Sequence, residues 1–440
     1  MHWRVLVSLL AGSVSLAQAS QPVPAAETPP NVLVVFTDDQ RFDTIHALGN
    51  EEIRTPNLDA LIGRGFHFRN AYCMGGLVPA VCAPSRTMFM TSRTLFRIPA
   101  PNAKTYEGPT LGSVFRNAGY DALFVGKKGN SFLAGNQAFE KVVYHDDREP
   151  SKRAESSRFM ADQAIDWLRA RGKTDRPFLM YLAPPVPHDP RIAPVEYMRM
   201  YDPDHVSLSP NFRPEHPFDN GELRIRDELL APFPRTPAEM RRHLAEYYAS
   251  ITWLDHNVGR VVEALRGSGA LDRTIIVFSS DQGLAVGGRH GLMGKQNLYE
   301  EFKSPLIFAG PGIPQGSSDA LVYLHDILPT ICEMASIPIP REFEGSSLVP
   351  VIQGRKPNVR EVLFGAYRDC QRMVRDERWK LLWYPKIDRF QLFDLANDPW
   401  EIHDLSTDPG QVDRLSRMKA ILGEEQHRHG DDRVARLTPR

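Results

Sequence analysis

The stretch NVLVVFTDDQ, residues 31–40, passes from a mostly apolar run to two adjacent carboxylates. Its first seven residues form a short apolar run, which predicts a buried β-strand. Asp38 and Asp39 follow that run directly. In open α/β sheets, ligands bind at the carboxyl ends of the strands. This stretch therefore predicts both a buried sheet and the edge of that sheet where function resides.

A second stretch, TIIVFSSDQG at residues 274–283, repeats the arrangement, with Asp281 and Gln282 after its apolar run. An Asp at the end of a strand often only caps a turn or a helix, and for one such stretch alone that interpretation is the commoner one. Carboxylate and amide oxygens are, however, the donors that Ca²⁺ or Mg²⁺ prefers. Two similar strand ends in one chain favour a metal site that combines them with Asp38 and Asp39.

Further apolar runs alternate with helical patterns along the chain. Strands are also expected at 121–126, 177–183 and 304–310, and helices at 55–65, 155–171 and 237–266. In the first helix, Thr55 is the expected N-cap, Pro56 lies in the first turn, and Gly65 is the expected stop signal. The alternation predicts an α/β fold, in which a large, mixed, mostly parallel sheet is sandwiched by helices.

The pattern changes after about residue 356. The segments RMVRDERWKLLWYP (372–385) and RFQLFDL (389–395) predict antiparallel strands, and a helix is expected at about 411–428. We therefore expect a main domain at 31–355 and a small C-terminal α+β subdomain with an antiparallel sheet at 356–440. The Pro-rich segment 184–237 is long enough to form the wall of a pocket.

Composition and charge limit the classes of function. A chain of 440 residues with 42% hydrophobic residues can bury a large core. Its 53 basic and 54 acidic residues give a net charge of -1, and neither sign forms a long run. This balance argues against general binding to nucleic acid or to a membrane surface, and it favours a small specific ligand.

The N-terminus has the features of a signal peptide. An apolar run at 5–16 is followed by Ala17-Gln18-Ala19, which predicts cleavage after Ala19. The run is short for a bilayer span, so a membrane anchor is not expected. Residues 20–30 are a Pro- and Ala-rich lead-in with little capacity to pack. We expect a mature protein that is secreted or periplasmic.

The four cysteines have sparse and irregular spacing: Cys73, Cys82, Cys332 and Cys370. They do not resemble a disulfide framework, and spacing leaves Cys82 equally open to a structural or a functional role. In VCAPSRTMFMTSR (81–93), Pro84 fits the first turn of a helix, which places Cys82 near an N-terminus that favours anions. Arg86 adds a fixed cationic fork, although it could instead pair with an acidic neighbour.

These residues carry a resemblance to a known family. Cys82-Ala83-Pro84-Ser85-Arg86, followed by Met90-Thr91-Ser92-Arg93, matches the Cys-x-Pro-Ser-Arg signature of sulfatases. Further blocks follow in the order of that family, including NVLVVFTDDQR, GYDALFVGKK, YLAPPVPHDP and FSSDQGLAVGGRHGLMGKQNLYEE. The chain resembles a formylglycine-dependent type I sulfatase of the alkaline phosphatase-like superfamily, and it is most similar to exported sulfatases that act on polysaccharides.

The resemblance implies that a separate maturation enzyme oxidises Cys82 to formylglycine, whose hydrate supplies an oxygen nucleophile. Sulfate would pass to this hydrate, the alcohol would leave, and the second hydroxyl would allow elimination of sulfate. A divalent cation, Ca²⁺ or alternatively Mg²⁺, would polarise the sulfate and lower the pKa of the attacking hydroxyl. The implied cation ligands are Asp38, Asp39, modified Cys82, Asp281 and Gln282.

It also implies roles for charged side chains around the nucleophile. Asp281 would accept the proton of the attacking hydroxyl, and Arg86 and Lys127 would hold the formylglycine and spread negative charge. His188 and Lys295 match the residues that bind the sulfate and assist departure of the alcohol oxygen.

Two positions depart from the family pattern. Many relatives have Gly-Lys-Trp-His where this chain has Gly126-Lys127-Lys128-Gly129, so the histidine that supports the formylglycine is missing. Either Asn130 replaces it or the position has no replacement. Gln282 stands where Asn or His is commoner, and its amide reaches one methylene further.

The resemblance implies a sulfate ester of a small molecule or an oligosaccharide as substrate, with His290 as a further candidate for contact with it. The stretch NFRPEHPFDNGELRIRDELLAPFPRTP (211–237) is equally consistent with a saccharide-binding surface and with a structural wall. Two other functions remain open: a phosphate or phosphonate monoester hydrolase on the same scaffold, and a non-catalytic glycan-binding protein if Cys82 is unmodified.

Overall fold

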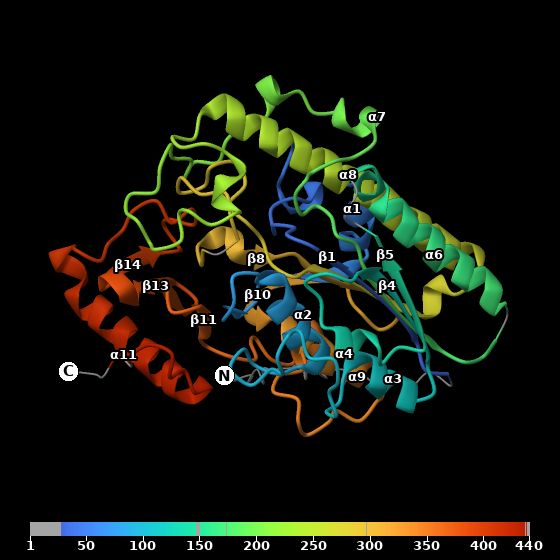
Figure 1. The fold of residues 1–440 in the computed structure, drawn as a ribbon. Coiled ribbons are helices and arrows are strands. Elements are labelled where there is room, and N and C mark those ends of the chain that lie inside the picture. Colours follow the sequence, from blue (N-terminus) through green and yellow to red (C-terminus); the bar gives the residue numbers. More distant parts are fainter. Residues whose placement is uncertain (1–27, 147–149, 173, 296, 436, 438–440) are drawn as a thin grey trace, which may run out of the picture.

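The structure is a computed structural model that describes residues 28–146, 150–172, 174–295, 297–435 and 437. The expected signal peptide (1–19) and residues 20–27 of the lead-in lie outside the described residues. A large sheet crosses the molecule, helices cover both of its faces, and a smaller sheet lies beside it near the C-terminus (Figure 1). Within the described part, no helix is long and apolar enough to cross a membrane.

The large sheet has nine strands, with β10-β2-β9-β7-β1-β6-β4-β5 in spatial order and β8 paired with β2. Its members are β1 (Asn31–Thr37), β2 (Gly65–Tyr72), β4 (Asp121–Lys127), β5 (Lys141–His145), β6 (Phe178–Ala183), β7 (Thr274–Ser280), β8 (Lys303–Ser304), β9 (Leu306–Ala309) and β10 (Gly316–Tyr323). Most pairings are parallel, but β9 runs antiparallel to β7 and β2, and β8 runs antiparallel to β2. The predicted mixed, mostly parallel sheet is confirmed.

The centre of this sheet determines where the functional edge lies. Strands β1 and β7 pair in parallel from Asn31↔Thr274 to Thr37↔Ser280, so both strands end at the same level. The side chains of β1 alternate between the two faces, as a strand requires. Val32, Val34 and Phe36 belong to one hydrophobic cluster, whereas Leu33 and Val35 belong to another.

Helices pack on both faces of the sheet (Figure 1). One face is covered by α1 (Pro56–Ile62), α6 (Ser156–Arg171) and α8 (Pro237–Gly267), and the other by α2 (Cys82–Thr91), α3 (Leu111–Asn117) and α9 (Ile327–Met334). Shorter helices are α4 (Leu133–Asn136), α5 (Pro150–Ala154), α7 (Val195–Met198) and α10 (Val349–Ile352). The helices expected at 155–171 and 237–266 are confirmed as α6 and α8 to within one residue.

The end of the first helix differs from the prediction. Helix α1 ends at Ile62 with Gly63 as its C-cap, and Gly65 is the first residue of β2 rather than a stop signal. A Cβ at Gly65 would lie 2.3 Å from the carbonyl oxygen of Phe308, so close strand pairing explains this glycine. Thr55 precedes the helix but makes no capping hydrogen bond, because its hydroxyl donates to Asp59 Oδ1 instead.

The second sheet has the order β14-β13-β12-β11-β3. Its strands are β3 (Gly75–Gly76), β11 (Leu363–Tyr367), β12 (Gln371–Arg375), β13 (Trp379–Tyr384) and β14 (Arg389–Asp394), and α11 (Val412–His429) packs on it. Strands β11 to β14 are antiparallel, as expected, whereas β3 pairs in parallel with β11. Because β3 precedes α2 in the chain, this sheet is joined to the segment that leads to Cys82.

Substituting Phe36 is expected to destabilise the fold strongly. Phe36 is fully buried at the end of β1 and stacks on Phe89 of α2, with ring centroids 4.7 Å apart. Phe36→Ala should lower the free energy of unfolding by about 3–5 kcal/mol, measured by denaturant titration. Val195→Ala on exposed α7 is the control and should change it by less than about 0.5 kcal/mol. Equal effects of the two substitutions would contradict this packing.

Candidate active site

The level ends of β1 and β7 bring the two acidic stretches into contact. The backbone N–H of Asp39 donates to Asp281 Oδ1 at 2.9 Å, and the backbone N–H of Gln282 donates to the same oxygen at 3.0 Å. Asp39 has a left-handed backbone, with φ of 67°, a conformation that Asp adopts more readily than most residues. The predicted meeting of the two strand ends is thus present in the structure.

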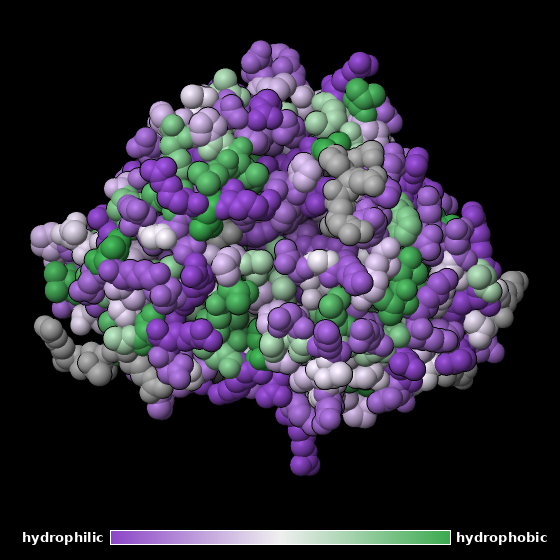
Figure 2. Space-filling view, viewed as in Figure 1, coloured by the Kyte–Doolittle hydropathy of each residue, from purple (hydrophilic) through white to green (hydrophobic). Residues whose placement is uncertain are grey.

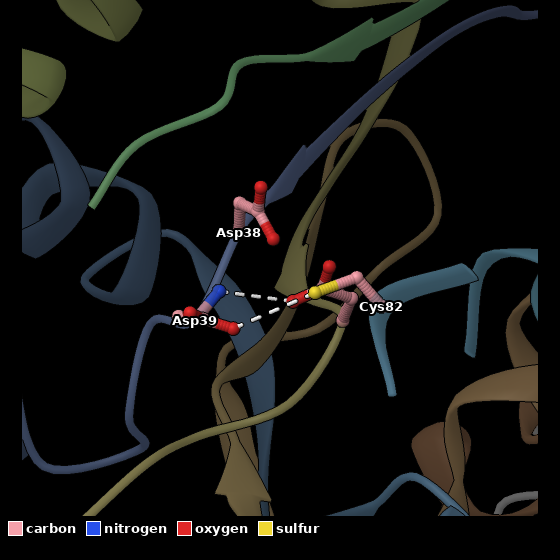
Figure 3. A group of neighbouring side chains, drawn as sticks. Asp38, Asp39 and Cys82 are labelled. Carbon is pink, nitrogen blue, oxygen red and sulfur yellow. Dashed lines mark hydrogen bonds between the residues drawn. The ribbon is translucent and has the colours of Figure 1, made fainter. Parts of the chain in front are cut away.

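Cys82 is the first residue of α2, and its side chain is fully buried against these carboxylates. Its thiol donates to Asp39 Oδ1 at 3.8 Å, and Figure 3 shows the sulfur pointing toward Asp39. Gln282 Nε2 and Lys295 Nζ each donate to Cys82 Sγ at 3.2 Å. Burial raises the pKa of the Cys82 thiol well above its usual value, and the charge of Asp38 raises it further. The unmodified residue is therefore a neutral thiol rather than a reactive thiolate.

Two cationic side chains, Arg86 and Lys127, form ion pairs with the carboxylates of Asp281 and Asp38. Arg86 Nε and Nη2 lie 3.1 and 3.0 Å from Asp281 Oδ2, and Nη2 also donates to the carbonyl of Thr37 at 3.1 Å. Lys127, at the end of β4, pairs with Asp38 Oδ2. The pairing of Arg86 with an acidic neighbour, considered from the sequence as an alternative to a functional role, is realised with Asp281, itself a candidate ligand.

Lys295 and His188 complete the centre on its other side. Lys295 Nζ donates to both oxygens of Asp39, at 3.1 and 3.0 Å, and His188 Nε2 lies 3.7 Å from Asp39 Oδ2. His188 is 9% exposed, and every other residue of this centre is less exposed. We refer to the following set as the Cys82 centre: Asp38, Asp39, Cys82, Arg86, Lys127, His188, Asp281, Gln282 and Lys295.

The protonation states follow from burial and from the crowding of charge. Burial opposes ionisation of Asp38, but the charges of Lys127 and its cationic neighbours outweigh it and hold its pKa well below the usual value. Burial, reinforced by the charge of Asp38, raises the pKa of Asp281 to about 8. Burial and the charge of Lys295 lower the pKa of His188, whereas Asp39 keeps the pKa of Lys295 well above its usual value despite burial. Lys295 is thus the cation beside Cys82, and His188 is neutral at pH 7.

The donor set fits a divalent cation. Asp38 Oδ1 and Gln282 Oε1 are buried acceptors that have no hydrogen-bond partner in the described part of the chain. One ligand atom from each of Asp38, Asp39, Cys82 and Asp281 lies within 4.8 Å of the others. Buried oxygens without partners are costly unless a ligand satisfies them, and oxygen donors favour hard cations. The amide nitrogen of Gln282 donates a hydrogen bond to Asp39. For Gln282 to bind a cation beside Asp39, its amide group would have to flip so that the oxygen faces the ion.

The structure places two predicted residues elsewhere. His290 lies in a separate buried cluster, where Nε2 bonds to Glu300 Oε2 at 2.8 Å and the ring stacks on Tyr299. Within the described residues, none of its hydrogen bonds reaches the Cys82 centre. Asn130, the candidate replacement for the missing histidine, is exposed to solvent.

Several residues that support the centre carried no signal in the sequence. The Tyr247 hydroxyl donates to the carbonyl of Asp39 at 2.6 Å, and Tyr181 accepts from Arg86 at 3.4 Å. Arg153 Nη2 lies 3.3 Å from His188 Nδ1 and donates to the carbonyl of Pro185. A tyrosine on a helix or strand is indistinguishable from a core residue until the fold is known.

The sulfatase family model matches residues 30–337, and the model for the C-terminal region of N-sulphoglucosamine sulphohydrolase matches residues 288–428. The chain therefore belongs to the sulfatase family, and it is a sulfatase enzyme.

Characterised relatives extend over most of the chain. N-acetylglucosamine-6-O-sulfatase of Bacteroides thetaiotaomicron is 24% identical and covers 96% of this chain and 90% of its own length. Choline-sulfatase of Rhizobium meliloti is 29% identical, with coverages of 85% and 81%. The sulfatase blocks quoted from the sequence all lie within residues 30–337, which the sulfatase family model matches.

Two solved structures show the same fold. A protein in complex with its substrate D-glucosamine-2-N,6-O-disulfate has a TM-score of 0.77 at 21% identity and covers 92% of this chain and 99% of its own. The phosphonate monoester hydrolase of Agrobacterium radiobacter has a TM-score of 0.77 at 21% identity, with coverages of 91% and 96%. The predicted alkaline phosphatase-like fold is confirmed.

Binding of a divalent cation is expected to weaken as the pH falls below about 8. The raised pKa of Asp281 means that a cation must displace a proton below that pH. For one proton, the affinity should fall by up to about tenfold per pH unit, as measured by calorimetric titration. Asp38→Asn, which removes a carboxylate whose Oδ1 accepts no hydrogen bond within the described residues, should abolish binding. Wild-type affinity in this variant would contradict the site.

Proposed function

We propose that this sulfatase removes sulfate from a sulfated carbohydrate through a formylglycine derived from Cys82, with a divalent cation, Ca²⁺, held by Asp38, Asp39, Asp281 and Gln282. One observation carries the proposal: Lys295 Nζ and Gln282 Nε2 converge on Cys82 Sγ, each at 3.2 Å. The side chain at position 82 thus lies between oxygen donors that suit a cation and a permanent positive charge.

Modification supplies what the thiol lacks. A buried thiol whose pKa is raised is a poor nucleophile, whereas a formylglycine hydrate supplies an oxygen nucleophile and a second hydroxyl for elimination of sulfate. When bound, a divalent cation polarises a sulfate oxygen and favours ionisation of the attacking hydroxyl. Maturation requires a separate enzyme that recognises the Cys82-Ala83-Pro84-Ser85-Arg86 motif.

The chain's own residues then have distinct tasks. Arg86 and Lys127 offset the negative charges of Asp281 and Asp38, which lowers the cost of burying these carboxylates next to one another. Asp281 is the proposed proton acceptor, because burial and the charge of Asp38 raise its pKa. Since Arg86 Nε and Nη2 both point at Asp281 Oδ2, uptake of a proton on this oxygen would displace one of these contacts.

Lys295 and His188 face the leaving alcohol oxygen in this proposal. The permanent charge of Lys295 offsets the negative charge that develops on that oxygen. Neutral His188 would donate a hydrogen bond to it in the tautomer that carries the proton on Nε2, the nitrogen that faces Asp39. His188 is the most exposed member of the centre, which suits contact with an arriving substrate. We infer that the ester approaches from this side.

The relatives support a sugar sulfate as the substrate class. N-acetylglucosamine-6-O-sulfatase and the protein bound to D-glucosamine-2-N,6-O-disulfate both act on aminosugar sulfates by their names. A small molecule or an oligosaccharide would satisfy this similarity. Export through the signal peptide expected at residues 1–19 would place the enzyme where such polymers are found. The phosphonate monoester hydrolase fold favours phosphonate esters as a second candidate substrate.

Parallel assays of sulfate, phosphate and phosphonate esters of one alcohol separate these functions. We expect the highest kcat/KM for the sulfate ester, and Cys82→Ala should remove that activity because no hydrate can form. Faster hydrolysis of the phosphonate would identify the second candidate as the function. Ligand binding without turnover by protein whose Cys82 remains unmodified in its host would instead indicate a glycan-binding protein.

Substituting Lys295 tests the proposed charge at the leaving oxygen. Lys295→Ala should lower kcat on an unactivated sulfate ester by about 10² or more, the usual scale for loss of a group that stabilises developing charge. Exposed Lys386→Ala is the control and should leave kcat unchanged. An unaltered rate for Lys295→Ala would remove this residue from the chemistry.

A further inference from the structure

Glu228 is a buried carboxylate that grips the loop before Lys295. Its Oε1 accepts from the backbone N–H of Gly294 at 2.9 Å, and its Oε2 accepts from the backbone N–H of Met293 at 2.9 Å. Glu228 is 1% exposed, and Arg235 Nη2 neutralises it at 2.8 Å. The two carboxylate oxygens thus accept hydrogen bonds from the backbone N–H groups of the two residues directly before Lys295.

These hydrogen bonds from Met293 and Gly294 to Glu228 help to determine the position of the Lys295 ammonium group. A lysine side chain is flexible, so the position of its charge depends on a fixed backbone at its root. The carbonyl of Gly294 also accepts from the backbone N–H of Ala285 at 2.8 Å, which ties the loop to the segment that follows Asp281. The root of Lys295 is therefore held from two sides, and its Nζ reaches Cys82 Sγ and Asp39.

The same short segment also reaches the loop that carries His188. Arg226 makes a two-pronged contact with Asp189, from Nη1 to Oδ2 at 2.5 Å and from Nη2 to Oδ1 at 3.0 Å. Its Nε donates to Asp227 Oδ1 at 2.8 Å. Because Asp189 follows His188 directly, residues 226–228 contact the neighbours of both side chains that face the leaving oxygen.

The contacts of Glu228 with the loop differ from those of a side chain that only fills the core. A buried ion pair such as Glu228–Arg235 adds little net stability, because desolvation offsets the attraction. An apolar pair of similar volume would pack the same space, but it would leave the N–H groups of Met293 and Gly294 without acceptors. Glu228 therefore fixes the loop through two backbone groups that an apolar side chain could not bind.

We propose that Glu228 is a positioning residue for Lys295, and that the segment Arg226–Asp227–Glu228 aligns Lys295 and His188 together. The inference rests on the proposed function, since it assumes that Lys295 and His188 act at the leaving oxygen. It assigns part of the 211–237 segment to alignment of the centre.

The leaving group distinguishes positioning from a general structural role. Glu228→Gln should lower kcat/KM by about 10- to 100-fold on an unactivated alkyl sulfate, the range for residues that orient a catalytic group. The loss should be much smaller on an aryl sulfate whose alcohol leaves readily, because that ester depends less on Lys295. Equal losses on both esters would contradict positioning.

Glu222, which lies in the same 211–237 segment as Glu228, provides a matched control. Glu222 is also a buried glutamate, but it bonds to Arg368 at 2.7 Å and to the Tyr367 hydroxyl at 3.2 Å, beside the second sheet. Glu222→Gln makes the same chemical change and should leave the ratio of the two rates unaltered. If Glu228→Gln does not fold, Glu228→Asp keeps the charge with a shorter reach, and it should shift the ratio in the same direction.

A double substitution separates this inference from the proposed function. In the Lys295→Ala background, Glu228→Gln should cause little further loss, because the residue that it positions is already absent. Losses that multiply would contradict positioning through Lys295. If Lys295→Ala itself slows both esters equally, the proposed role of Lys295 fails, whatever Glu228 does.

Discussion

Three carboxylates buried at the ends of two adjacent parallel strands are the constraint around which the active-site end of this molecule is organised. Strands β1 and β7 stop at the same level, so Asp38, Asp39 and Asp281 are brought together without solvent. Charges in such a place must be neutralised or bound by a metal. Arg86, Lys127 and Lys295 come from three separate parts of the chain to meet that demand.

Contacts from both faces of the main sheet and from the second sheet fix the positions of the residues that carry these charges. Stacking of Phe36 on Phe89 joins the end of β1 to α2, which begins with Cys82. Tyr247, on the opposite face, fixes the backbone of Asp39 through its hydroxyl. The second sheet reaches the same region through β3, which pairs with β11 shortly before α2 begins. The cysteine is therefore anchored from both faces of the main sheet and from the C-terminal part of the chain.

Much of this arrangement could be predicted from the sequence, because apolar runs that end in carboxylates are a local signal. The ranges predicted for β1 and β7 agree with the structure at both ends. Strands β2 and β10 were not predicted: β2 carries polar residues such as exposed Arg69 and half-buried Asn70, and β10 begins with GSSD. Their pairing is fixed by tertiary contacts rather than by local periodicity.

The site shows the same division between local and long-range information. Residues within the family motifs, such as Cys82 and Lys295, could be found from sequence. His290 also lies in a motif, yet its ring is bound to Glu300 in another cluster. Glu228 lies outside every motif. Its proposed positioning role depends on hydrogen bonds from two backbone N–H groups that lie 65 and 66 residues further along the chain. Such a contact becomes visible only in three dimensions.

The chemical identity of residue 82 in the active enzyme tests the account most directly. The protein should be produced with graded amounts of a formylglycine-generating enzyme, and the peptide containing residue 82 should be measured by mass spectrometry beside the rate of sulfate release. We predict that the rate rises in proportion to the fraction of Cys82 converted to formylglycine and vanishes when that fraction is zero. Full activity in protein whose Cys82 remains an unmodified thiol would contradict the central claim.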